Sequence, residues 1–292
     1  MDKRPANVWA LQTVRRLWAD FMAREPGALR GEDPEQLHRM RVAHRRLRTA
    51  IGSFAEVLPV DLTAADSELQ WIGDELGDVR DLDVQLEAMR TTATGLEASP
   101  ESIEGLLAAV NVQREQARKR MLEALVSKRF EALVLRIARS LRDQVTAGSA
   151  GGPLTIGELA PVMLEDRYRR FRKAARHLTP KSPPIDYHNA RRKARRLRFA
   201  TEFVEEIYGE PAEELIDAVT DLQDLFGDHQ DCYAAIELRR SVCKSLSEPA
   251  LTLARELDEQ DLVRAALLRR GGPDAVRRVE KRWKALKKAM KR

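Results

Sequence analysis

The sequence has few aromatic residues, only two cysteines and no long apolar run. Aromatic side chains make up 5% of its 292 residues, and no apolar stretch reaches the roughly 18 residues that a membrane-spanning helix needs. The first 21 residues carry charges within their apolar positions, which is not the pattern of a secretory signal. Cys232 and Cys243 have no CxxC partner. This excludes a disulfide framework and a cysteine zinc site, and predicts a cytoplasmic protein with no membrane partner.

Charge of each sign is abundant but segregated along the chain. The formal net charge is only +5, from 51 Lys and Arg against 46 Asp and Glu. Residues 38–48 hold five arginines and no acid, and residues 167–176 and 188–198 each hold six basic residues and no acid. Residues 199–238 hold twelve acids and no Lys or Arg. Such blocks usually form solvated faces, but several basic blocks in one chain indicate a polyanion partner.

Apolar residues recur with a period near 3.6 throughout the chain, and strand-like alternation is nearly absent, so the sequence predicts an all-α fold. A Gly-rich linker at 147–156 separates a first half, 1–146, from a second half, 157–292, within one domain. Breakers at 26–27 and 271–273 are predicted to end helices. The expected helices span about 8–26, 34–58, 61–89, 99–127, 127–145, 157–178, 186–208, 211–246, 249–270 and 273–290.

Two motifs occur twice, in the same order and with the same separation. HRMRVAHRRLR begins at His38 and HNARRKARRLR at His188, 150 residues later. LGDVRDLDV has its glycine at Gly77 and FGDHQDCYA has its glycine at Gly227, again 150 residues later. The sequence therefore predicts a tandem duplication that gives two helical bundles related by a pseudo-twofold axis.

The first motif places its basic residues on one strip of a helix. At about 100° per residue, one histidine and three arginines of each copy fall within an arc of roughly 80°, beside the apolar side that includes His44. We call these two sets the ridges: His38, Arg41, Arg45 and Arg48 in the first copy, and His188, Arg191, Arg195 and Arg198 in the second. If the halves pack about a twofold axis, the two ridges line a basic central cavity. A second interpretation stays open: acids on one face, at Asp221, Asp224, Asp228 and Asp231 or at Asp74, Asp78 and Asp81, form structural salt bridges with these arginines.

These residues resemble the CHAD family, the conserved histidine α-helical domain. The resemblance rests on the histidine followed by R-x-x-x-R-R-L-R, on the LG-x-x-RD-x-D-V helix, and on degenerate copies of both in the second half, HNARRKARRLRF followed by EFVEEIYG. It covers nearly the whole chain. Asn189 and Phe199 depart from the family pattern, which often has a charged residue and a tyrosine there. No E-x-E-x-K strand of a CYTH triphosphatase occurs, so a stand-alone module is expected.

Membership implies a two-bundle helical fold whose basic central cavity binds inorganic polyphosphate, without catalysis, metal or cofactor, at polyphosphate granules. Guanidinium groups suit this ligand because their forked donors match phosphate oxygens and stay charged. Whether the histidines contact the ligand or only support the helices is left open. The predicted polyphosphate-binding residues are His38, Arg41, Arg45, Arg46, Arg48, His188, Arg191, Lys193, Arg195, Arg196 and Arg198.

Other functions are compatible with parts of the sequence. A nucleic-acid-binding helical protein could use the same basic channel, but base readout needs exposed amide or aromatic side chains, which are scarce among the arginines. Other polyanions are also candidate ligands, because a basic channel attracts negatively charged polymers in general. DLQDLFGDHQD superficially resembles the Mg²⁺-diphosphate site of all-α isoprenoid synthases but lacks their clustered DDxxD arrangement. No histidine and cysteine spacing fits a zinc site.

Overall fold

The computed structural model describes residues 2–93, 98–146 and 154–291, and within these ranges it is helical with no strand. The all-α prediction is confirmed. None of the described helices is long and apolar enough to cross a bilayer. Most of the predicted linker at 147–156 lies outside the described residues.

The helices of the first half are α1 (Ala6–Arg30), α2 (Pro34–Ser53), α3 (Val60–Ala64), α4 (Asp66–Ala93), α5 (Pro100–Leu125) and α6 (Lys128–Thr146). Those of the second half are α7 (Ile156–Ala175), α8 (Pro184–Glu202), α9 (Glu205–Tyr208), α10 (Glu210–Val242), a 3-10 turn (Cys243–Ser245) and α11 (Glu248–Ala289). Three of the predicted spans are therefore shorter or divided: α2 ends at Ser53, α4 is separated from α3 at Ala65, and α8 is separated from α9.

The helix starts follow from local capping chemistry. The Asp33 side chain accepts from the Glu35 N–H at the start of α2, and the Ser99 side chain accepts from the Ser102 N–H at the start of α5. These two predicted starts are confirmed. One predicted end is wrong, because α1 continues through Pro26 and Gly27 to Arg30. Gly27 serves close packing instead, since a Cβ there would lie 2.7 Å from Cγ of Gln36 on α2.

The predicted break at 271–273 is also wrong, because α11 is one continuous helix across it. Pro273 has no N–H to give to the carbonyl of Arg269 four residues earlier. The hydroxyl of Tyr187 on α8 lies 3.3 Å from that carbonyl and 3.0 Å from the carbonyl of Thr179, so its single proton is shared between these two acceptors. Gly272 lets the helices approach, since a Cβ there would lie 3.1 Å from the Tyr187 ring. A hydroxyl from another helix thus compensates in part for the bond that proline removes.

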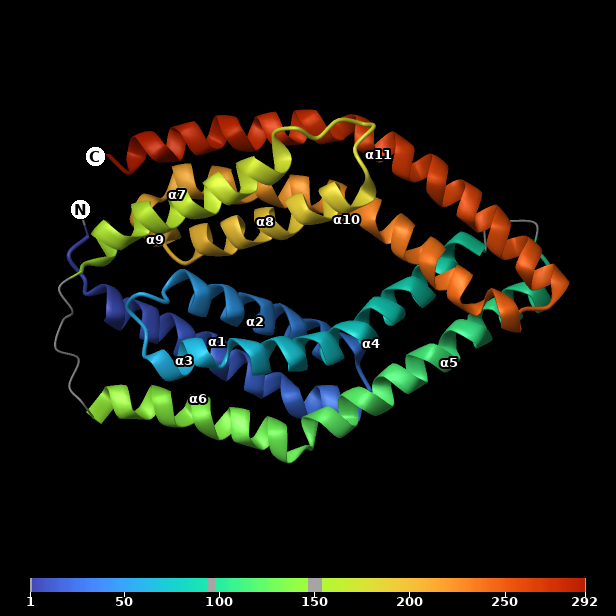
Figure 1. Cartoon of the computed structure of the whole chain (residues 1–292), viewed down its shortest axis with the longest axis horizontal. Helices are drawn as coiled ribbons and strands as arrows, with labels where there is room; N and C mark the ends of the chain where they lie inside the picture. Colours follow the sequence, from blue (N-terminus) through green and yellow to red (C-terminus); the bar gives the residue numbers. More distant parts are fainter. Residues whose placement is uncertain (1, 94–97, 147–153, 292) are drawn as a thin grey trace.

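The helices pack in the same order in both halves. α1 packs on α2, α2 on α4 and α4 on α5, while α7 packs on α8, α8 on α10 and α10 on α11. α2 and α8 lie side by side through the middle of the molecule (Figure 1). One large core joins both halves, and a smaller one at the far end joins α4, α5, α10 and α11. This order agrees with the predicted duplication, which itself stays a prediction.

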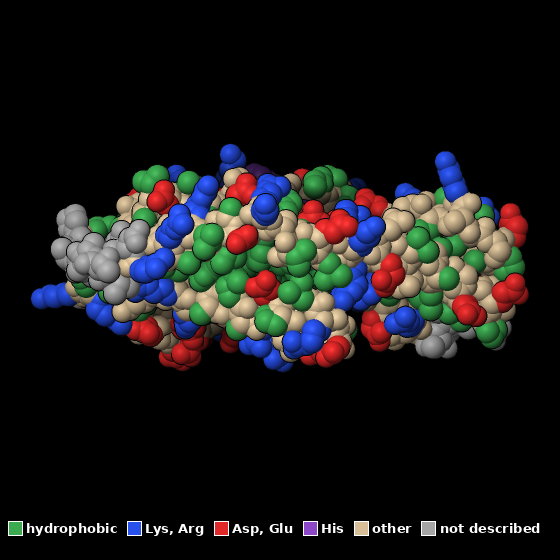
Figure 2. All heavy atoms as spheres, turned by 90° about the horizontal axis from the view of Figure 1, so that it is seen from below, with side chains coloured by type: hydrophobic (Ala, Val, Ile, Leu, Met, Phe, Trp, Pro, Cys, Tyr) green, Lys and Arg blue, Asp and Glu red, His purple; other side chains and the backbone are tan. Residues whose placement is uncertain are grey.

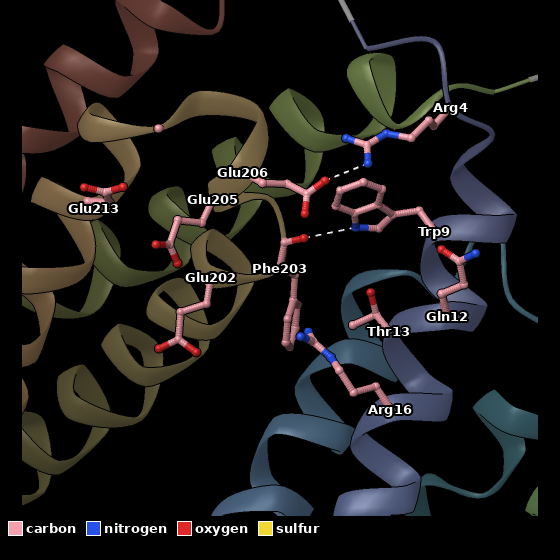
Figure 3. Close-up of a pocket in the computed structure, with 11 residues that line it drawn as sticks. Arg4, Trp9, Gln12, Thr13, Arg16, Glu202, Phe203, Glu205, Glu206 and Glu213 are labelled. Atoms are coloured by element: carbon pink, nitrogen blue, oxygen red, sulfur yellow. Dashed lines mark hydrogen bonds and ion pairs between the residues drawn. The ribbon is translucent and has the colours of Figure 1, made fainter.

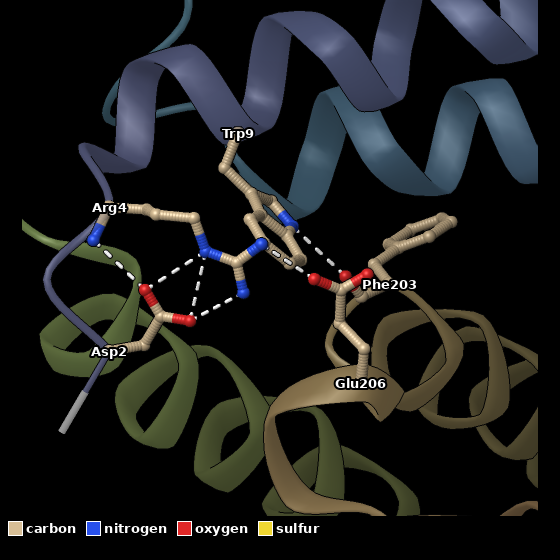
Figure 4. A network of polar contacts seen from close by, with 5 residues as sticks. All are labelled: Asp2, Arg4, Trp9, Phe203 and Glu206. Atoms are coloured by element: carbon tan, nitrogen blue, oxygen red, sulfur yellow. Dashed lines mark hydrogen bonds and ion pairs between the residues drawn. The ribbon is translucent and has the colours of Figure 1, made fainter.

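The N-terminal segment fastens the two halves together at the opposite end. The indole N–H of Trp9 on α1 donates to the carbonyl of Phe203 at 3.0 Å, and Arg4 pairs with Glu206 at 2.6 Å (Figure 4). The Arg4 guanidinium also lies over the Trp9 ring, 4.2 Å from its centre. These contacts, together with the packing of α2 on α8, fix the position of one basic helix against the other.

Candidate functional site

Within each half, the arginine-rich motif contacts the glycine-containing motif. The first ridge arginine of α2 lies on α4, and the first ridge arginine of α8 lies on α10. Arg41 on α2 donates from Nη1 to the carbonyl of Gly77 at 2.5 Å. In the second half, Arg191 on α8 donates from Nε to the carbonyl of Gln223 at 3.2 Å and crosses α10 at Gly227. A Cβ would lie 3.1 Å from Nη1 of Arg41 at the first glycine and 2.9 Å from Nη2 of Arg191 at the second. Each glycine therefore leaves room for a guanidinium group, which explains why the motifs occur together.

Arg45 and Arg195 form the centre of the site, where α2 packs against α8. Both side chains are partly buried, and neither makes a hydrogen bond or an ion pair with another described residue. Burial lowers the pKa of Arg195, and the neighbouring charges of Arg45 and Arg191 lower it further. Burial and the charge of Arg41 likewise lower the pKa of Arg45. The structure thus brings Arg45 and Arg195 near each other with no ion pair of their own. The charge of Asp81, which pairs with Arg41, only partly opposes the pKa shift of Arg45. We call this region the α2/α8 seam.

Acids neutralise the arginines at the end of each ridge and Arg46 beside them. Arg48 pairs with Asp66 at 2.8 Å, and Glu202 pairs with Arg46 at 2.8 Å and with Arg198 at 3.3 Å. These side chains tie α2 to α4 and to α8. The salt-bridge interpretation therefore holds in part. Arg41 pairs with Asp81, one of the acids that the sequence suggested, at 2.9 Å. Asp66 and Glu202 are acids that it did not suggest.

The acidic series on α10 contributes little to this pairing. Asp228 pairs with Arg264 on α11 at 3.5 Å. Within the described ranges, Asp221 and Asp224 make no ion pair with a ridge arginine. Burial raises the pKa of Asp231, and the nearby charge of Arg191 opposes this shift. The series is thus no counterpart to the central arginines.

A second group of basic residues continues the seam towards α7. Lys193 and Arg196 on α8 have no ion pair with another described residue, and burial lowers the pKa of both. Arg170 of α7 is among the neighbouring charges that lower these pKa values further. Arg167 of α7 donates to the carbonyl of Gly52 at the end of α2, at 2.6 Å. The basic block at 167–176 thus adds residues to the site that the prediction left out.

The two histidines lie at the start of their ridges. Burial lowers the pKa of His38, and the charge of Arg80 lowers it further. Burial likewise lowers the pKa of His188, and the charges of Arg192 and Arg191 lower it further. Arg80 belongs to the LGDVRDLDV motif on α4, and its buried Nε has no hydrogen-bond partner in the described chain. Arg80 and Arg192 are therefore further candidate ligands that the sequence analysis missed, although both lie within its motifs.

Two hollows of the molecule lie outside this seam. A cavity of about 450 Å³ opens beside Trp9, between α1 and the α8–α10 corner (Figure 3). Four glutamates line it, together with Arg4 and Arg16: Glu202, Glu205, Glu206 and Glu213. A second cavity, of about 190 Å³, lies between α4, α10 and α11. Neither contains a residue of the predicted polyphosphate site, so the basic central cavity stays a prediction and the observed feature is the seam.

The underside of the molecule differs from the seam in its charge pattern. Basic, acidic and apolar side chains are mixed on the face that is seen from below, where α5 and α6 lie (Figure 2). Several acids on nearby helices pair with arginines there, such as Glu68 with Arg129 at 2.6 Å. No field of one sign develops on this face, which makes it a suitable place for control substitutions.

Comparison with known proteins agrees with this architecture. The family model of the CHAD domain matches residues 12–240. This chain belongs to the CHAD family. The family is associated with polyphosphate binding in general.

Relatives and solved structures extend the comparison. "Uncharacterized protein Rv2226" and "Uncharacterized protein MT2285", from two strains of Mycobacterium tuberculosis, are each 28% identical over 225 residues, which is 72% of this chain and 41% of theirs. The chain thus spans about two fifths of their length. The crystal structure of the CHAD domain from the plant Ricinus communis matches with a TM-score of 0.76 and 21% identity, over 99% of this chain and 93% of that one. PptA from Streptomyces chartreusis matches with a TM-score of 0.68 and 16% identity, over 96% and 99%. At these identities the two structures support the fold alone.

Proposed function

We propose that this CHAD domain binds inorganic polyphosphate along the α2/α8 seam, without hydrolysing it. The observation that carries the proposal is the pair Arg45 and Arg195, which lie near each other, are partly buried and form no ion pair with another described residue. Like charges in such a setting repel, and the repulsion is weakly screened because solvent has little access. A bound polyanion replaces the repulsion with charge-assisted hydrogen bonds.

The chemistry of the seam suits a polymer of phosphate alone. Two helices present guanidinium groups whose forks match phosphate oxygens, and polyphosphate offers no bases to read. Phe199 lies beside the seam but is buried, with the guanidinium of Arg198 5.0 Å from its ring centre. It therefore provides no platform on which a nucleobase could stack. Binding of this kind would place the protein at cytoplasmic polyphosphate granules.

Capture on immobilised long-chain polyphosphate tests the proposal, with duplex DNA, RNA and ATP as competitors. At equal phosphate concentration we expect free polyphosphate to release the protein most effectively. We expect affinity to fall with salt by about 0.7–0.9 log units per log salt for each phosphate contact, if the nucleic-acid slopes carry over. Better competition by DNA or RNA would favour a nucleic-acid-binding protein instead. Phosphate release in the presence of Mg²⁺ would overturn binding without hydrolysis.

We expect polyphosphate affinity to rise as the pH falls through the range in which His38 and His188 titrate. In the free protein the pKa of each histidine lies below its ordinary value of 6.5. A bound polyanion raises both pKa values, so binding takes up protons and is favoured by acid between the free and the bound pKa. Dissociation constants measured across this range check the prediction.

The control for this pH dependence is the double variant His38→Gln with His188→Gln. This variant retains the arginines of the seam. Any pH dependence that remains in it therefore comes from titration of the ligand. We expect its affinity to depend less on pH than that of the unaltered protein. An identical pH profile for both proteins would show that the histidines have a structural role only.

A further inference from the structure

The second half of α11 carries a row of basic side chains far from the α2/α8 seam in sequence. Its members are exposed and recur at intervals of four and three residues, which keeps the four helical members within an arc of roughly 60° on one helix face. We call this set the α11 basic row: Arg277, Lys281, Lys284 and Lys288 of the helix, with Lys291 in the turn after its end at Ala289.

The row is almost without counter-charge. Arg277 pairs with Asp274, and the four lysines make no ion pair with another described residue. Lys287, which lies off the row, pairs with Glu165 of α7 at 3.0 Å. Neighbouring like charges destabilise a helix by about 0.2–0.5 kcal/mol per pair. The helix dipole compensates only in the last turn, which Lys281 and Lys284 precede.

The α7 helix connects this row to the α2/α8 seam. α7 packs on α11 through the stacked rings of Tyr168 and Trp283, whose centres are 4.2 Å apart, and through the ion pair of Arg172 with Glu280 at 3.2 Å. Next to this contact, α7 exposes three further basic residues with helical spacing, Arg169, Lys173 and Arg176.

The opposite edge of α7 reaches the seam. Arg167 and Arg170 lie there, close enough to Lys193 and Arg196 of α8 to disfavour their charged forms. Asp166 neutralises part of α7, since it pairs with Arg169 at 2.8 Å and with Arg170 at 2.7 Å. Basic side chains therefore follow one another from α8 across α7 to α11.

We propose that the α11 basic row is a second contact surface for the same polyphosphate chain, reached across α7, so that long chains bind both surfaces and short chains bind the seam alone. This inference rests on the proposed function. A chain already held at the seam is present at the row at high effective concentration, so weak lysine contacts suffice to add affinity.

The composition of the row favours polyphosphate over other polyanionic partners. The aromatic rings nearest to it, Trp283 and Tyr168, are buried and cannot stack on bases. The large exposed apolar residues of α11 are Leu262, Val263 and Leu267, all of which precede the row. The described part of α11 therefore offers no apolar side chains along the row that would enter a lipid surface.

The test is a variant with all five residues of the row changed to glutamine, compared for short and long size-fractionated polyphosphate. We expect its affinity for long chains to fall about 100-fold, and its affinity for short chains to stay unchanged. The salt dependence for long chains should weaken by about 0.7–0.9 log units per lost contact. A charge-matched control changes five exposed basic residues of α5 and α6 to glutamine: Lys119, Lys128, Arg136, Arg139 and Arg142. We expect this control to bind both chain lengths almost normally.

Each other outcome contradicts the inference in a recognisable way. Equal affinity of the row variant and the control for long chains would show that the row is only a solvated face. Loss of binding to duplex DNA or to anionic lipid vesicles, with polyphosphate binding intact, would assign the row to another partner. If the unaltered protein fails to bind even short chains, the proposed function itself is wrong, and this result does not depend on the row.

Discussion

Changing Arg45 and Arg195 together to glutamine is expected to abolish most polyphosphate binding without lowering the melting temperature. Each guanidinium contributes charge-assisted hydrogen bonds worth about 1.5–3 kcal/mol, so the pair accounts for roughly 3–6 kcal/mol if the two contributions add. Neither side chain forms an ion pair with another described residue that the substitution would break. Removing two repelling charges should leave the free energy of unfolding unchanged or raise it. Titration calorimetry and thermal unfolding of the same variant measure both effects.

Variants of the outer arginines and of a remote pair separate binding from stability. Arg46→Gln with Arg48→Gln breaks the ion pairs with Glu202 and Asp66, so we expect a lower melting temperature. Such partly exposed pairs contribute up to about 1 kcal/mol each. Arg39→Gln with Arg90→Gln, both exposed, should change neither quantity appreciably. A folded Arg45 and Arg195 variant that binds normally would remove these residues from the site.

Changing Gly73 to alanine is expected to give the largest loss of stability of any single methyl group added to α4. A Cβ at this position would overlap the imidazole ring of His44 on α2. That ring is buried, and its Nε2–H donates to the carbonyl of Leu69 at 2.5 Å. Burial lowers the pKa of His44 to about 4, so the ring stays neutral and fixed in the core. We expect a cost of about 3 kcal/mol, or roughly 6–12 °C in melting temperature.

Gly105→Ala on α5 is the matched control for this substitution. A Cβ there would make only an ordinary contact, 3.5 Å from the Cβ of Ala250. Because alanine favours a helix over glycine by about 1 kcal/mol, the control should be neutral or stabilising. In a His44→Ala background, Gly73→Ala should cost less than in the unaltered chain, since the two groups then no longer collide. An equal cost in both backgrounds would contradict the proposed overlap.

The sequence contained the information for most helices and for the location of the site. Capping residues such as Asp33 and Ser99 act within a few residues, so their effect can be predicted from local sequence alone. The apolar period places His44 in the core and Arg41, Arg45 and Arg48 beside it, because a helix has a fixed rotation per residue. The match of the CHAD family model to residues 12–240 confirms the family to which these motifs pointed.

Which arginines are neutralised was decided only when the helices packed. Arg45 and Arg48 look alike in the sequence, but Arg48 meets Asp66 at the start of α4, whereas Arg45 meets Arg195 of the other half. No local rule distinguishes them, since charge pairing depends on residues that are distant along the chain.

Helix continuity shows the same division between sequence and tertiary structure. Gly271, Gly272 and Pro273 locally favour a helix end, and in isolation the carbonyl of Arg269 would lack a partner. In the folded chain the hydroxyl of Tyr187 lies 3.3 Å from that carbonyl and compensates in part, and the glycines let α11 approach α8 and α10. The sequence by itself thus determined the helix faces and most of their starts. Tertiary packing determined that α11 continues through 271–273 and which arginines form no ion pair, because both depend on partners supplied by other helices.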